Sequence, residues 1–401
     1  MKKILLVLAF AGLCISSVDA QNATEKKVPH SARLSNNVPA RRTEIILPSV
    51  NGFNCYKGDF HIHTSFSDGN VTPGARILEA WYDGLDIVAI TDHYEGQKGI
   101  KTFFKVAAGH ADEGQTFSYK SASKTGKVST DFEAIHKLAE GQIEKSGLPM
   151  LLVRGCEMAR NAQSHGHFNV LFLSHFNDLY NKDMAQAFRN AKKQGAIIIH
   201  NHPAWRRKTS DKTEFHQQVY NEGLIDGVEV VNGTTFYPQI VRRCLDEKLT
   251  MYANTDEHGM TASRFGSAGF HRTMTLVFAK NLTEKAVKDA LLKRRTLAYA
   301  AGTLIGEESL LKDFLNAAVD CRITRVDEKK GNRTFQVTNM SSITYRLRRG
   351  KLIYELEPFK SLQFYLGKDK KTGKFVEPKF SVENMYHVDY KHPSIVLEID
   401  K

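Results

Sequence analysis

Histidine and carboxylate residues with the spacing of metal ligands recur along this sequence. The segment from Gly58 to Gly69 reads GDFHIHTSFSDG. His61 and His63 are one residue apart, so on a β-strand both imidazoles would point to the same face. Asp68 follows in a Ser-Asp-Gly sequence that is typical of a turn. These residues could begin a metal site, or they could be two half-buried histidines of an ordinary strand.

Five further segments carry the same residue types, and most of them follow an apolar run. Because the carboxyl ends of the strands share one face in an α/β barrel, we expect these side chains to converge. Imidazole and carboxylate ligands without cysteine suit Mn²⁺, Fe or Zn²⁺. Two segments have H-x-H spacing and leave the choice of histidine open. The candidates are His93 in TDH, Glu157 in LLVRGCE, His165 or His167 in HGHFNVL, His200 or His202 in HNHP, and Asp256 and His258 in DEH.

The elements that would position these residues alternate between strands and helices. Several strand-like runs are apolar nearly throughout, which is typical of parallel strands covered on both faces. Thr72 and Pro73 begin a helical pattern that Gly84 ends. An alternation of this length predicts a (β/α) barrel or a similar α/β architecture. The expected strands are 59–63, 86–91, 150–154, 167–173, 196–200, 227–231, 250–254 and 273–278, and the later helices are 131–145, 184–194, 238–248 and 282–295.

The character of the sequence changes near residue 310. Short, partly alternating runs are separated there by Gly, Pro, Asn and Lys. This pattern predicts a small all-β, sandwich-like domain over residues 310–401. None of the chemistry-bearing segments falls in it.

The first twenty residues are expected to be a signal peptide. Lys2 and Lys3 precede a short apolar run, and small residues precede Gln21, so cleavage is expected after Ala20. An alternative is lipid attachment at Cys14. Residues 21–51 would be an N-terminal tether, and the mature protein would be periplasmic or secreted, without a transmembrane segment.

The net charge of +12 suits an anionic partner. Because the chain has no long Lys/Arg block and no nucleic-acid-binding motif, we expect a small anionic molecule rather than a nucleic acid. The cysteines after the signal peptide form neither a zinc-finger pattern nor a dense disulfide framework. One or two disulfides would be compatible with an oxidising compartment. These cysteines are Cys55, Cys156, Cys244 and Cys321.

Together and in this order, the segments HIHTSFSDG, TDH, the strand-end glutamate, HFNVL, NHP and DEH resemble the PHP (polymerase and histidinol phosphatase) family over about Tyr56 to Leu304. The resemblance implies a distorted (β/α)7 barrel, assigned to residues 52–306, and two or three divalent metal ions that act on phosphoesters. It favours His167 over His165 and His202 over His200. It implies that a first metal is bound by His61, His63, Glu157 and Asp256. A second metal would share Glu157 as a bridging ligand and would also be bound by His167 and His202. A third would be bound by Asp68, His93 and His258.

Such a cluster would ionise water and neutralise phosphoryl oxygens. We therefore expect a metal-bound hydroxide to attack phosphorus, with all the implied ligands except His167 acting in catalysis. Guanidinium groups match phosphate geometry, so at least one of Arg160, Arg206 and Arg264 should bind the phosphate. Arg264 and Arg160 are the leading candidates.

Charged neighbours of these residues are expected to support them. Asp92 and Glu257 would orient imidazoles from outside the cluster. Glu229, in an apolar run, would either line the cleft or be structural.

The sequence thus predicts an exported, metal-dependent phosphoesterase that hydrolyses small organic phosphate mono- or diesters. Two other functions are compatible with the same residues. One is a non-catalytic, metal-containing protein that binds an anionic or carbohydrate ligand, and the other is a metal-dependent amidohydrolase. The sequence predicts no particular oligomeric state.

Overall fold

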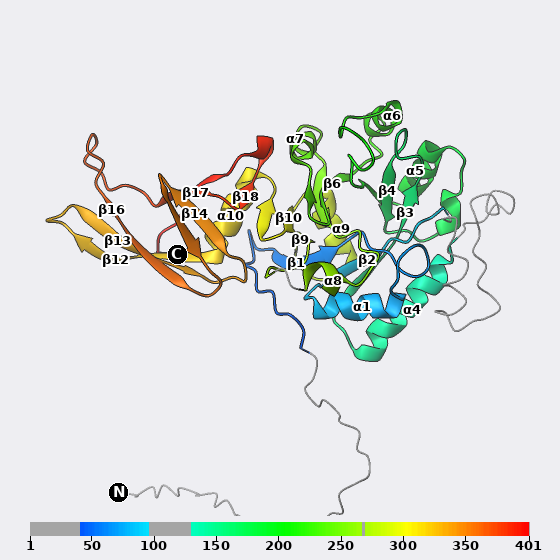
Figure 1. Cartoon of the computed structure of the whole chain (residues 1–401), viewed down its shortest axis with the longest axis horizontal. Coiled ribbons are helices and arrows are strands. Elements are labelled where there is room, and N and C mark those ends of the chain that lie inside the picture. The colour runs from blue at the N-terminus through cyan, green and yellow to red at the C-terminus, as the bar shows by residue number, and fades with distance from the viewer. Residues whose placement is uncertain (1–40, 96–129, 267–268, 401) are drawn as a thin grey trace, which may run out of the picture. The chain divides into compact units, whose positions relative to one another are not determined.

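The computed structural model describes residues 41–95, 130–266 and 269–400 (Figure 1). The predicted signal peptide, Cys14 and residues 21–40 of the predicted tether lie outside the described residues. Within these ranges, no helix is both long enough and apolar enough to span a bilayer. The four cysteines of the described chain are free, so none of them forms the disulfides that the sequence left open.

A mixed sheet of twelve strands, counted over the described residues, forms the larger part of the fold. Its order is β18-β11-β10-β9-β1-β2-β3-β4-β5-β6-β7, and β8 pairs with β6. The strands are β1 (Asn54–Asp59), β2 (Ile87–Ile90), β3 (Leu151–Ala159), β4 (His167–Leu171), β5 (Ile197–His200), β6 (Gly227–Asn232), β7 (Thr235–Phe236), β8 (Thr250–Asn254), β9 (Met274–Ala279), β10 (Thr296–Ala300), β11 (Thr303–Ile305) and β18 (Met385–Tyr386).

The sheet curls into a distorted barrel, which confirms the predicted fold. A parallel bridge between Ile62 and Glu257 joins the chain after β1 to the chain after β8. The backbone N–H of His63 donates to the carbonyl of Glu257, and that of Asp256 donates to the carbonyl of His61. The segments that carry the first and last predicted ligands therefore lie side by side.

Helices follow most of the strands. Pro73 begins α1, as predicted, and Asp131, Asp183, Thr213 and Thr283 cap other helices by accepting backbone N–H groups. α1 and α4 lie side by side (Figure 1). The helices are α1 (Pro73–Tyr82), α4 (Phe132–Ser146), α5 (Met184–Lys193), α6 (Glu214–Asn221), α7 (Pro238–Asp246), α8 (Thr261–Phe265), α9 (Glu284–Leu292) and α10 (Glu308–Ala318), with 3-10 turns η1 (Phe176–Leu179) and η2 (Val388–Tyr390).

Strand β3 differs from its prediction, because it continues to Ala159 instead of ending at Arg154. Its second half pairs antiparallel with β4, from Gly155 opposite Leu171 to Ala159 opposite His167. Glu157 consequently lies inside a strand rather than after one, and the sheet is mixed rather than all parallel.

The C-terminal residues form two antiparallel sheets, β12-β13-β16 and β15-β14-β17-β19, as the predicted all-β domain requires. Phe335 and Phe364 of the first sheet stack on each other, and Phe364 contacts Phe380 of the second. The strands are β12 (Val319–Asp327), β13 (Asn332–Asn339), β14 (Tyr345–Arg349), β15 (Leu352–Leu356), β16 (Ser361–Gly367), β17 (Lys379–Val382) and β19 (Ser394–Val396).

Two features at the junction were not expected from the sequence. Helix α10 covers the start of the range assigned to the β-domain. Strand β18, from the C-terminal part of the chain, pairs parallel with β11 of the barrel sheet, with Leu304 opposite Met385. The C-terminal part therefore contributes a strand to the barrel.

Candidate metal centre

Glu157 is the centre of the site. It is buried in β3, in the half that pairs with β4. Nitrogens of five imidazoles lie 2.8–3.6 Å from its carboxylate oxygens, namely those of His61, His63, His93, His167 and His202. One carboxylate surrounded by five imidazoles is an arrangement that an ordinary barrel core does not need.

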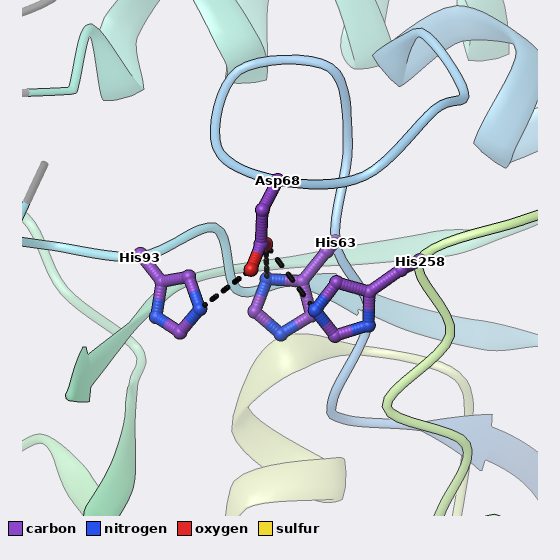
Figure 2. Close-up of side chains that lie close together, drawn as sticks. All are labelled: His63, Asp68, His93 and His258. Atoms are coloured by element: carbon purple, nitrogen blue, oxygen red, sulfur yellow. Dashed lines mark ion pairs between the residues drawn. The ribbon is translucent and has the colours of Figure 1, made fainter. Parts of the chain in front are cut away.

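Asp68 lies among three imidazoles, those of His63, His93 and His258 (Figure 2). It comes from the loop after β1, and its Oδ1 lies 3.4 Å from Nδ1 of His63 and 3.2 Å from Nε2 of His258. Its Oδ2 lies 3.2 Å from Nε2 of His93. Figure 2 shows the carboxylate reaching toward the three imidazoles from one side.

Three groups of the described residues could each hold a metal ion, since one ligand atom from every member lies within 4.8 Å of the others. The groups are His63, Asp68, His93 and His258; His61, His63 and Asp256; and His61, Glu157 and His202. The sets implied by the family resemblance differ in four respects. His63 also joins the Asp68 group, and His61 also joins the group of Glu157 and His202. Glu157 is not grouped with His61, His63 and Asp256. His167 belongs to none of the three groups, although its Nδ1 is 3.2 Å from Glu157.

The structure separates the two ambiguous histidine pairs. His167 and His202 face Glu157. His165 instead lies 2.8 Å from the Ser164 hydroxyl, and Nδ1 of His200 lies 2.8 Å from the Tyr220 hydroxyl.

The donor set fits divalent metal ions. The Nε2 atoms of His61 and His63 are 3.2 Å apart, and each is 3.1 Å from the same oxygen of Asp256. Nδ1 of His93 is buried without a well-directed hydrogen bond. Nitrogen lone pairs that face one another and a carboxylate oxygen can be satisfied together by a shared cation.

The carboxylates of the site are held in the ionised form that metal binding requires. Burial alone would raise the pKa of Glu157, but His93, His167 and His61 hold it well below its ordinary value. Burial also opposes ionisation of Asp68, whose pKa is lowered mainly by hydrogen bonds to His258 and His93. Burial opposes ionisation of Asp256 too, and its pKa is lowered first by the charge of His61 and then by a hydrogen bond from His63.

Among the described residues, neither the Asp92 nor the Glu257 carboxylate contacts an imidazole directly. Asp92 accepts hydrogen bonds from Thr64 and Ser67, and it reaches His63 only through the Ser67 hydroxyl. The Glu257 carboxylate accepts from the backbone N–H of Gly259. Asp92 thus stabilises the loop after β1, whereas Glu257, whose Oε2 also lies 3.4 Å from Nη1 of Arg264, stabilises its own loop.

Other buried side chains contact the site and were missed or left undecided by sequence reasoning. Asn201 donates to Glu157 Oε1 at 2.9 Å. Arg76, fully buried in α1, donates to the carbonyls of His63 and Glu257. Glu229 lies 2.8 Å from Nδ1 of His61. The position of Glu229 in the apolar run GVEVV was the one feature of the sequence that could have indicated its role. No feature of the sequence indicated the role of Arg76.

A cavity of about 610 Å³ opens beside the cluster. Glu157, Asp256 and His258 are among its lining residues, and Trp205 and Arg206 also line it. The Trp205 ring is 40% exposed and lies 4.9 Å from His167 and 5.3 Å from His202.

The three predicted phosphate-binding arginines lie in different surroundings. Arg160 lines the cavity, but its Nε donates to Glu95 and its Nη atoms donate to two backbone carbonyls. Arg264 is not among the lining residues, and its Nη1 donates to the carbonyl of Thr255. Arg206 lies over the Trp205 ring at 4.4 Å and has no acidic partner among the described residues. Of the three, Arg206 is therefore the one that lines the cavity without an acidic partner in the described part of the chain.

Among solved structures, the chain is similar to a two-domain protein from Bacteroides vulgatus that contains a predicted PHP-like metal-dependent phosphoesterase. The two share 32% sequence identity with a TM-score of 0.75, over 89% of this chain and 98% of that chain. This chain is also similar to a lesion-specific endonuclease from Pyrococcus furiosus, at 13% identity and a TM-score of 0.39, over 63% of this chain and 59% of that chain. No family model and no curated protein matches the chain.

Proposed function

This chain belongs to the PHP-like metal-dependent phosphoesterase family, and we propose that it hydrolyses mono- or diesters of phosphate with small organic molecules. The observation that carries this proposal is the ring of five imidazoles around buried Glu157, beside an open cavity. The cavity volume of about 610 Å³ is that of a small-molecule site, which supports a small substrate rather than a nucleic acid.

Two or three divalent ions, Mn²⁺, Zn²⁺ or Fe²⁺, would bind to the three groups of residues. The groups share His61 and His63, and a neutral imidazole has one lone pair, so each of these two histidines would ligate one ion. One ion would be held by His61, His63 and Asp256, and a second by Glu157 and His202 with His167 beside them. A third would be held by Asp68, His93 and His258. Bound ions of this kind lower the pKa of water and neutralise phosphoryl oxygens.

Residues of the chain itself would orient the substrate. The Arg206 guanidinium is the candidate to hold a non-reacting phosphoryl oxygen, because Arg160 is already committed to other acceptors. The indole of Trp205 would pack against the organic part of the ester, next to His167 and His202. Arg76 would hold the loops of His63 and Glu257 in place.

A panel of substrates tests this proposal. Phosphate monoesters, phosphodiesters, a carboxamide and a single-stranded oligonucleotide would be assayed with the protein loaded with Mn²⁺, Zn²⁺ or Fe²⁺. We expect hydrolysis of at least one small phosphate ester. If a protein with a full metal complement hydrolyses none of the compounds, this result would favour the non-catalytic binding function. Hydrolysis of the carboxamide alone would favour the amidohydrolase.

Arg206→Ala is expected to raise KM about tenfold with little change in kcat, because a charge-assisted hydrogen bond to an anion contributes about 1.5 kcal/mol or more. Steady-state kinetics on the best ester of the panel would measure this. Lys208→Ala is the matched control, since Lys208 is an exposed cation two residues away and is not among the lining residues. An unchanged KM in Arg206→Ala would exclude the proposed contact.

We also propose that the protein is exported, to the periplasm or the medium, as its first twenty residues predict. Expression of the full chain in a bacterial host, followed by N-terminal sequencing of the exported protein, should then give Gln21 as the first residue. A product that stays in the cytoplasm and begins at Met1 would contradict export, and a lipid-modified Cys14 would indicate the anchored form.

A further inference from the structure

Glu229 is a fully buried carboxylate in β6 with four polar contacts. Its Oε1 lies 2.8 Å from Nδ1 of His61 and accepts from the Asn254 side chain at 3.0 Å. Its Oε2 accepts from the backbone N–H of His202 at 2.7 Å and from the Asn232 side chain at 3.0 Å. An ionised carboxylate only accepts hydrogen bonds, so it can satisfy all four of these donors.

These contacts reach three of the candidate metal ligands. The bond to His61 Nδ1 leaves Nε2 of the same ring directed at Glu157, 3.4 Å away, and at Asp256, 3.1 Å away. The bond to His202 fixes a backbone in the left-handed region, with φ of +24°, which a histidine rarely adopts. Asn232 lies between Glu229 and Asp256, 3.3 Å from Oδ2 of the latter.

The Asp68 group has different support. The Thr130 hydroxyl donates to the carbonyl of His93 at 2.7 Å. Nδ1 of His258 lies 2.9 Å from the carbonyl of Asp256. Ser67 contacts both His63 and Asp68. Within the described chain, none of these contacts involves Glu229.

We propose that Glu229 is a positioning residue for one half of the metal centre. It fixes the groups His61–His63–Asp256 and His61–Glu157–His202, and it leaves the group of Asp68, His93 and His258 able to bind an ion without it. This inference depends on the proposed function only in that the three groups bind divalent ions. It does not depend on any hydrolysis.

Glu229→Gln is the informative substitution, because it keeps the size of the side chain. The amide has one accepting oxygen, and its NH2 group donates. In either orientation, two of the four donors would therefore face another donor. Loss of such an orienting partner typically weakens metal binding about 10- to 100-fold. We expect that loss at the two Glu229-supported groups and wild-type affinity at the Asp68 group.

Metal binding to the purified, metal-free full chain tests this directly. Mn²⁺ would be titrated by calorimetry and the ions per chain counted by elemental analysis after equilibrium dialysis. Glu229→Gln should keep one tightly bound ion, and the double variant with Asp68→Asn should lose it. Asp86→Asn is the control, since this buried carboxylate pairs with Arg42 and Lys57 instead of the cluster, and it should bind metal as the wild type does.

The outcomes are separable. Wild-type stoichiometry and affinity in Glu229→Gln, or loss of every ion from a folded variant, would overturn the selective role. If circular dichroism shows that Glu229→Gln is unfolded, Glu229→Asp keeps the charge on a shorter side chain and should weaken the same two groups by a smaller factor. An unchanged Glu229→Asp would then refute the role. A wild-type protein that binds no metal would instead refute the proposed function.

Discussion

Glu157→Gln is expected to lower kcat/KM about a thousandfold or more and to reduce the number of bound ions by at least one. Nitrogens of five imidazoles lie 2.8–3.6 Å from the Glu157 carboxylate, and an amide cannot supply its charge. Several kcal/mol of transition-state stabilisation depends on correctly placed metal ions, which corresponds to a rate loss of about this size. Kinetics with the best substrate and elemental analysis of the same sample would measure both effects.

The substitution has a control at a buried carboxylate outside the cluster. Asp86→Asn removes a carboxylate that pairs with Arg42 and Lys57, and it should retain activity and metal content. Wild-type turnover in Glu157→Gln would show that this carboxylate is not part of the catalytic centre. Loss of activity in both variants, with both unfolded, would indicate a general effect of charge removal on folding.

Removal of the divalent ions is expected to abolish hydrolysis and to lower the melting temperature by several degrees. A ligand that binds only the native state at a free concentration a thousand times its Kd raises the free energy of unfolding by about 4 kcal/mol. Calorimetry with and without a chelator, followed by re-addition of metal, would show the loss and its recovery. Glu157→Gln, with fewer ions, should show a smaller change in melting temperature. Full activity in a sample shown to be metal-free would contradict a metal-dependent mechanism.

The fold class and the clustering of the nine histidine and carboxylate residues followed from local sequence features. The H-x-H spacing placed His61 and His63 together, although both lie after β1, which ends at Asp59, instead of within the predicted strand. The residues after the apolar runs converge because those runs are neighbouring strands. The full extent of β3 could not be predicted in this way. The extension of β3 to Ala159 depends on its pairing with β4, which the run of apolar residues in β3 does not encode.

The supporting residues were hidden because their partners lie far away in the sequence. Glu229 bonds to His61, 168 residues away, and nothing near Glu229 distinguishes a supporting carboxylate from a structural one. The sequence gives no sign that Arg160 is paired, because its partner Glu95 lies 65 residues earlier. Spacing within a segment predicts which face a side chain occupies, but only the folded chain shows whether a charge already has a partner.

The pairing of β18 with β11 has a consequence for the history and the engineering of this chain. The boundary between the two parts of the sequence is not a boundary in the sheet, because Met385 pairs with Leu304 across it. A truncation or a domain exchange that removes the C-terminal part would expose the β11 edge, and unpaired strand edges promote aggregation. The barrel and the β-domain should therefore be inherited, expressed and recombined as one module.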